Sequence, residues 1–90
     1  MSVEINLPPV LQALVGDIRQ VDVAGGTVGA CLEDLVERYP PLKPRLFDKK
    51  NKLPAGINIF VNRENAYPDP LAKKVAEGDK IYISYIVLGG

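Results

Sequence analysis

The sequence predicts an α+β domain in which one main helix lies across one face of a mixed β-sheet. Short segments with alternating apolar and polar residues recur along the chain, and this is the period of strands that bury one face. One longer segment, residues 28–39, instead repeats its apolar residues at helical spacing. The predicted order is strand, strand, helix, strand, a minor element and a final strand, which is the order of an α+β domain.

The first two strands are near neighbours along the chain. Residues 2–7 alternate between polar and apolar side chains and stop at Pro8-Pro9, because proline cannot donate to a strand ladder. Residues 19–23 alternate in the same way and are followed by the turn-forming pair Gly25-Gly26. We therefore predict a hairpin whose loop has about ten residues.

The main helix is predicted to begin after Thr27 and to end near Tyr39. The Thr27 hydroxyl is placed to accept a hydrogen bond from an amide of the first turn, and Pro40-Pro41 cannot continue a helix. The apolar residues that share one side of this helix are Val28, Cys31, Leu32, Leu35, Val36 and Tyr39.

Residues 40–56 show no clear period and contain several prolines. We interpret them as a long surface connection, with a short turn at residues 45–47 that tucks Leu46 and Phe47 under the core. A connection of this length without regular structure is uncommon in a compact domain. Alternation returns at residues 57–62 and predicts the third strand.

The remaining chain is predicted to hold turns and one more strand. Residues 62–65 and 68–70 have turn composition, and residues 71–75 can form one helical turn. Glu77-Gly78-Asp79 predicts a tight turn. The following residues 80–86, KIYISYI, are β-branched and aromatic, which is typical of a strand.

The simplest arrangement of these elements places the first and last strands side by side. A right-handed crossover between the second and third strands then puts the helix over one face of the sheet. The residues predicted to fill the core are Val3, Ile5, Val21, Val23, Leu32, Leu35, Ile57, Ile59, Val61, Ile81 and Ile83.

Composition excludes several classes of function. The 90 residues are predicted to form a single domain, residues 1–90. Eleven basic and eleven acidic residues give no net charge, so a nucleic-acid partner is not expected. The chain has no histidine and one cysteine, which excludes Ser-His-Asp and Cys-His catalysis and intramolecular disulfides and argues against a metal site. The start of the chain resembles neither a signal peptide nor a membrane span, so we expect a cytoplasmic protein without a membrane partner.

The last ten residues, IYISYIVLGG, carry no charged side chain and finish with Gly89-Gly90. Residues 87–90 are predicted to form a tail that extends about 13 Å beyond the sheet, at roughly 3.3 Å per residue. Glycine has no Cβ and can thread a narrow channel. The tail is therefore suited to present the carboxylate of Gly90 to another protein's active site.

These segments resemble the ubiquitin-like sulfur carriers of the ThiS/MoaD family, and most of all its MoaD-like and CysO-like subgroup. The resemblance is carried by TVGACLEDL at 27–35, Tyr39-Pro40, INIFVN at 57–62, Leu71 with EGDK at 77–80, and Gly89-Gly90. It implies a β-grasp (ubiquitin-like) fold with a mixed sheet of about four to five strands and one main helix across one face. One departure is the stretch before the glycines, which contains no proline here.

The resemblance also implies a function in which the protein is a cosubstrate and not an enzyme. An E1-like adenylating enzyme would use ATP to activate the Gly90 carboxylate, with Gly89 keeping the approach open, and no cofactor would be bound by the carrier itself. The thiocarboxylate formed would pass sulfur to a biosynthetic enzyme, for molybdopterin, thiamine, cysteine or a related product. Two alternatives are a ubiquitin-like modifier joined to lysines through Gly90 and a β-grasp interaction module that binds partners without covalent chemistry.

One face of the sheet is predicted to bind a partner. Phe60 and Tyr82 fall on the parity opposite the core, with Ile86, Val87 and Leu88 nearer the tail. Exposed apolar groups beside a reactive tail are typical of an interaction surface. Partial cover by the long loop is the alternative.

Three other features have a structural interpretation beside a functional one. Cys31 is predicted to be a buried helix residue rather than a sulfur-handling thiol. The basic residues of the long loop are predicted to form a solvated surface rather than a docking site, and Glu77-Gly78-Asp79 to form a turn rather than a carboxylate site. The basic residues are Lys43, Arg45, Lys49, Lys50 and Lys52.

Overall fold

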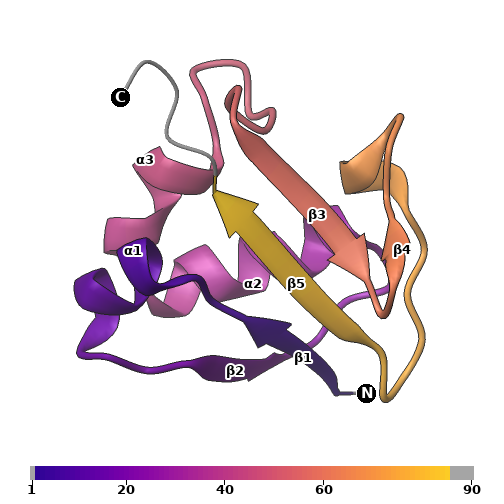
Figure 1. The fold of residues 1–90 in the computed structure, drawn as a ribbon, viewed down its shortest axis with the longest axis horizontal. Coiled ribbons are helices and arrows are strands. Elements are labelled where there is room, and N and C mark those ends of the chain that lie inside the picture. Colours follow the sequence, from indigo (N-terminus) through magenta and orange to yellow (C-terminus); the bar gives the residue numbers. More distant parts are fainter. Residues whose placement is uncertain (1, 86–90) are drawn as a thin grey trace.

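A mixed five-stranded sheet, with the strand order β2-β1-β5-β3-β4, is the centre of the fold. The computed structural model describes residues 2–85, and Figure 1 looks onto the sheet with the main helix, α2, behind it. The predicted fold class is confirmed. The strands are β1 (Val3–Asn6), β2 (Gln20–Val23), β3 (Ile57–Val61), β4 (Glu64–Asn65) and β5 (Lys80–Tyr85).

The predicted hairpin is present, with β1 antiparallel to β2. Its connection is more structured than predicted, because it contains α1 (Pro9–Gln12) and the 3-10 helix η1 (Ala13–Val15). Pro9 is compatible with a first helical position, and Leu11 and Val15 are buried. Gly16, with φ of 68°, ends the turn in the left-handed conformation. Two apolar residues are too short a sequence pattern to distinguish a helical turn from a loop.

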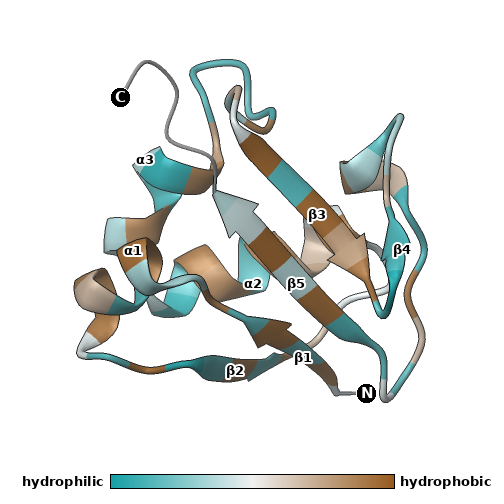
Figure 2. Ribbon diagram, viewed as in Figure 1, coloured by the Kyte–Doolittle hydropathy of each residue, from teal (hydrophilic) through white to brown (hydrophobic). Residues whose placement is uncertain are grey.

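The first and last strands lie side by side, as predicted, and they run parallel. Ile81 of β5 lies beside Ile5 of β1 on one side and Val61 of β3 on the other. This register places the apolar residues of three strands on one face, and every residue predicted for the core is buried. Figure 2 shows the alternation along the strands.

Helix α2 (Val28–Arg38) supplies the other half of the core. The Thr27 Oγ1 accepts a hydrogen bond from the Ala30 amide over 3.1 Å, which confirms the predicted N-cap; such a cap is worth about 1 kcal/mol. The helix ends at Arg38, one residue before Tyr39 and two before the first proline, Pro40. Its buried residues are Val28, Cys31, Leu32, Leu35 and Val36.

The long connection after α2 is not an irregular loop throughout. It forms η2 (Pro40–Leu42) and α3 (Lys43–Leu46), in which prolines occupy early positions where their missing N–H is tolerated. Leu42, Leu46 and Phe47 are buried, so the predicted apolar pair does pack into the core. The prediction of a long structureless segment was wrong in its first half, because proline was treated only as a helix breaker.

Two smaller elements also differ from prediction. Residues 64–65, assigned to a turn, form the short strand β4, which pairs with β3 after Asn62 adopts a φ of 57°. The predicted helical turn at 71–75 is the 3-10 helix η3 (Pro70–Ala72). Among residues 2–85, no helix is long and apolar enough to cross a membrane.

Candidate functional site

The candidate site is a row of side chains on the sheet face opposite α2. Ile81 and Ile83 of β5 are buried in the core, so Tyr82 between them points to the other face. Phe60 of β3 lies directly opposite Tyr82, and Asn6 of β1 lies beside Tyr82 on its other side. Asn65 of β4 is paired with Phe60, and Gln20 of β2 is paired with Asn6, so this outer row crosses all five strands.

The aromatic pair forms the centre of the outer row. Directly opposed residues of antiparallel strands have Cβ atoms about 5 Å apart, so the two rings belong to one surface. Tyr82 is 40% exposed, while Phe60 is half-buried. In the described part of the chain no helix covers this face (Figure 1), and the long connection instead buries its apolar residues in the core.

Of the predicted site residues, the structure describes Phe60 and Tyr82, and it brings these two together. Ile86, Val87, Leu88, Gly89 and Gly90 lie outside the described residues. The last described residue, Tyr85, is paired with Ile57 at the start of β3. The chain therefore leaves the sheet on a strand that passes through the middle of the outer row.

Sequence reasoning missed Asn6 and Asn65 as neighbours of the aromatic pair. Strand alternation already placed Asn6 on the face opposite the core, but only the register of β1 against β5 puts it next to Tyr82. No signal for Asn65 was available, since a strand of two residues is too short to show alternation.

The turn that leads into β5 has a structural role, as predicted for Glu77-Gly78-Asp79. Gly78 has a φ of 87°. The Asp79 carboxylate accepts hydrogen bonds from the Ala76 amide over 2.8 Å and from the Asn62 side chain over 3.2 Å. These bonds lower the pKa of Asp79, the Ala76 amide having the larger effect.

The lowered pKa predicts acid sensitivity of the fold. The unfolded chain binds a proton at Asp79 at higher pH than the folded chain does, so protonation favours unfolding. The pKa of Asp79 in the unfolded chain is about 3.9. The free energy of unfolding is therefore expected to decrease as the pH falls from about 5 through the lowered pKa of the folded protein. Urea titrations between pH 5 and 3 should show a smaller loss for Asp79→Asn than for the wild type. Parallel losses in the two proteins would contradict the assignment.

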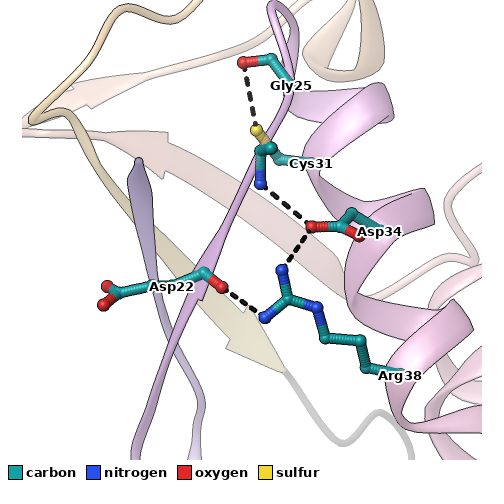
Figure 3. Close-up of polar contacts among 6 residues, drawn as sticks. Asp22, Gly25, Cys31, Asp34 and Arg38 are labelled. Carbon is teal, nitrogen blue, oxygen red and sulfur yellow. Dashed lines mark hydrogen bonds and ion pairs between the residues drawn. The ribbon is translucent and has the colours of Figure 1, made fainter. Parts of the chain in front are cut away.

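Cys31 is buried on the inner side of α2 (Figure 3). Its Sγ donates a hydrogen bond to the Gly25 carbonyl over 3.7 Å. Burial raises the pKa of the Cys31 thiol above its ordinary value, and the negative charge of Asp34 adds to this effect. A thiol held protonated is a poor nucleophile, so the structural interpretation of Cys31 is the one supported.

We therefore expect Cys31 to be unreactive in the folded protein. Alkylation at neutral pH should be at least about 100-fold slower than in concentrated urea, because reaction requires local opening. The rate can be followed by intact mass. Fast alkylation of the folded protein would show that the thiol is accessible and would reopen a sulfur-handling role.

No cluster of three or more histidine, cysteine, aspartate or glutamate side chains suited to a metal ion occurs within residues 2–85. The geometry of the candidate site is that of a binding surface. Two aromatic side chains lie at the centre of an open sheet face, and the sequence after the last described residue, Tyr85, is apolar up to Gly89-Gly90.

The fold and this surface define a β-grasp protein of the ubiquitin-like class. The family model described as the ThiS family matches residues 5–90, and the chain belongs to that family. This confirms the resemblance found from the sequence motifs.

Individual relatives match over nearly the whole chain. The sulfur carrier protein CysO of Mycobacterium tuberculosis is 34% identical over 93 residues, with all of both chains covered. A chain in the crystal structure of the Amycolatopsis orientalis BexX/CysO complex superimposes with a TM-score of 0.86 at 31% identity, covering 98% of this chain and 99% of the other. Haloferax volcanii SAMP1, a small archaeal modifier protein, has a TM-score of 0.86 at 33% identity, with both chains fully covered.

Proposed function

We propose that this protein is a sulfur carrier, a substrate protein whose Gly90 carboxylate becomes a thiocarboxylate. The observation that carries the proposal is the match, over the full length of both chains, to relatives named sulfur carrier protein CysO. The sequence Gly89-Gly90 at the end of the chain supplies the group that such chemistry needs.

The chemistry needs only the carboxylate from this chain. A carboxylate oxygen of Gly90 attacks the α-phosphorus of ATP on an E1-like enzyme, and pyrophosphate leaves. A hydrosulfide sulfur then attacks the acyl-adenylate carbonyl, AMP leaves, and a C–S bond replaces a C–O bond. ATP and its binding site belong to the partner enzyme, and no cofactor is assigned to the carrier.

In this proposal the outer row binds the adenylating partner while the tail enters its active site. The aromatic pair Phe60 and Tyr82 supplies contact area on a rigid sheet, and aromatic side chains are enriched at the centres of interfaces. Ile86, Val87 and Leu88 would extend the contact toward Gly89-Gly90. The thiocarboxylate would then serve a sulfur-accepting biosynthetic enzyme, which the CysO-like resemblance associates with cysteine synthesis.

Intact mass of the carrier tests this proposal directly. After incubation with the adenylating enzyme, ATP and sulfide, the mass should change by replacement of one oxygen with sulfur. Deletion of Gly90 should prevent the change. No replacement in the wild type, or replacement that persists in the deletion variant, would refute the proposal.

The similarity to small archaeal modifier protein 1 favours a second candidate. In that case the activated Gly90 carbonyl is attacked by a lysine amine, and an amide bond to a target protein forms. Tagged carrier expressed in cells should then appear in covalent conjugates that require Gly90. Cell extracts that contain only the free carrier would count against it.

A third candidate, a non-covalent interaction module, rests on the outer row alone. It predicts that removal of Gly89-Gly90 leaves function intact. Loss of function with fold and partner binding retained would exclude this candidate.

A further inference from the structure

Five exposed cationic side chains are concentrated in residues 43–52. We call Lys43, Arg45, Lys49, Lys50 and Lys52 the basic segment. The chain as a whole has equal numbers of acidic and basic residues, so this concentration is a local asymmetry of charge. The same ten residues contain one acidic residue, Asp48.

Asp48 organises the turn that displays the lysines. Its carboxylate accepts hydrogen bonds from the amides of Lys50 over 2.7 Å and Lys52 over 3.0 Å. The Asp48 amide donates to the Lys52 carbonyl over 2.7 Å, and Asn51 adopts a φ of 60°. The neighbouring Phe47 is buried and anchors the turn. The lysines thus lie on a closed turn whose one carboxylate is engaged with the backbone.

The charge of the basic segment is not matched by carboxylates in the described structure. Within residues 2–85 the ion pairs are Arg38 with Asp34 and Lys73 with Glu64. Lys43 lies across a surface hollow from Glu33 and Glu37 of α2, so its charge is partly balanced. The remaining positive charge lies at Arg45, Lys49, Lys50 and Lys52, and of these Lys52 shares a hollow with the carboxylate of Asp69.

This excess charge lies where the chain leaves the sheet. Lys52 and Ile57 line the same hollow, and Ile57 is paired with Tyr85, the last described residue. In Figure 1 the loop after α3 and the end of β5 lie at the same end of the sheet, and Figure 2 shows that loop as hydrophilic.

The opposite end of the sheet has the opposite charge. The hollow beside the start of β5 is lined by four carboxylates and one lysine, with Ser2 and Gly78; its charged residues are Glu4, Asp22, Glu77, Asp79 and Lys80. Groups of residues with opposite net charge thus lie beside the two ends of β5, although the net charge of the chain is zero. Such a distribution orients a protein as it approaches a charged partner.

We propose that the basic segment is a docking surface for a carboxylate-rich rim around the active-site entrance of the adenylating partner. This inference rests on the proposed function and adds the charge of the partner surface. The basic segment meets the rim as the chain end enters, while the acidic end of the sheet is repelled and faces away. Exposed charges of this kind act on the association rate and its salt dependence more than on the dissociation rate.

The test compares two charge reversals of equal size in the full-length carrier. Lys49→Glu with Lys50→Glu changes the basic segment. Arg63→Glu with Lys74→Glu changes two exposed residues away from it, one in the β3–β4 turn and one beside Thr27. Association rates with the adenylating enzyme are measured at about 50 mM and about 500 mM salt, because exposed charges are screened at the higher value.

At low salt the basic-segment reversal should slow association at least about 10-fold, while the control changes it less than about 2-fold. The difference should disappear at high salt. The inference would be overturned if both variants slowed association equally, or if the basic-segment variant did not slow it or made it faster. Absence of wild-type binding would also overturn it. Circular dichroism checks folding, and Lys49→Gln with Lys50→Gln should give an intermediate rate.

Intact mass on the same samples separates this inference from the proposed function. Salt-dependent binding without sulfur replacement supports the docking surface and counts against the carrier function. If sulfur replaces oxygen but the charge reversal leaves the association rate unchanged, the result supports the carrier function and overturns the docking surface.

Discussion

Replacing Gly25 with alanine is expected to lower the free energy of unfolding by about 2 kcal/mol, as overpacked sites do. A Cβ on Gly25 would lie 2.8 Å from the Cys31 nitrogen and 3.0 Å from the Ala30 carbonyl carbon. Both contacts are with backbone of α2, so the connection and the helix have to move apart. Urea denaturation gives the free energy, and the melting temperature should fall by roughly 10 °C.

The contacts around Gly25 explain why this shift is costly. The neighbouring Ala24 amide donates to Asp34 over 2.9 Å. Asp34 also pairs with Arg38 over 2.9 Å, and Arg38 donates to the Asp22 carbonyl over 2.7 Å (Figure 3). Moving the connection away from α2 disturbs these bonds together.

Gly26 provides the matched control for Gly25. A Cβ at Gly26 would meet no atom within 4 Å. Gly26→Ala should therefore change stability by less than about 1 kcal/mol, and in the stabilising direction if the backbone accepts alanine. Similar losses in the two variants would show that the close approach at Gly25 is not the cause.

Replacing Tyr82 with alanine is expected to weaken binding of the proposed adenylating enzyme by about 10- to 100-fold, which is the range for a central aromatic contact. Tyr82 lies in the middle of the outer row and is 40% exposed. Truncation removes contact area without opening the core, so stability should change by less than about 1 kcal/mol. Calorimetric titration of the enzyme with each carrier measures the affinity.

Tyr67→Ala is the control for this substitution. Tyr67 is 79% exposed, more than Tyr82, but it lies after β4 and outside the outer row. If any exposed aromatic side chain contributed to binding through non-specific apolar contact, loss of Tyr67 would weaken binding at least as much as loss of Tyr82. Affinity unchanged by Tyr82→Ala would remove the outer row from the interface.

Strand alternation was sufficient to predict the strand residues of the core and to separate Tyr82 and Phe60 from them. Side chains alternate between faces with a period of two, so burial of Ile81 and Ile83 implies the orientation of Tyr82 wherever the strand lies. Thr27 and the prolines after Tyr39 likewise bounded α2 to within one residue, because capping and the loss of an N–H act locally.

The short elements were not predictable in the same way. In α1, η2 and α3 only a few residues carry the pattern, and isolated turns of this length are unstable without packing. They form because Leu11, Leu42 and Leu46 are buried against the rest of the core. Local sequence therefore marks these segments as proline-rich connections, and tertiary burial makes them helical.

The sequence by itself determined the fold class, the main helix, the core residues of the main helix and the long strands, and the family, because these depend on periodicity, capping and motifs along the chain. The tertiary structure alone decided which residues of separate strands become neighbours. Register sets Phe60 opposite Tyr82 with Asn6 beside it, and it brings the basic turn at 48–52 next to the end of β5. Charge and contact surfaces are properties of distances between remote residues, and a count of residues that sums to zero net charge cannot show how the charges are separated.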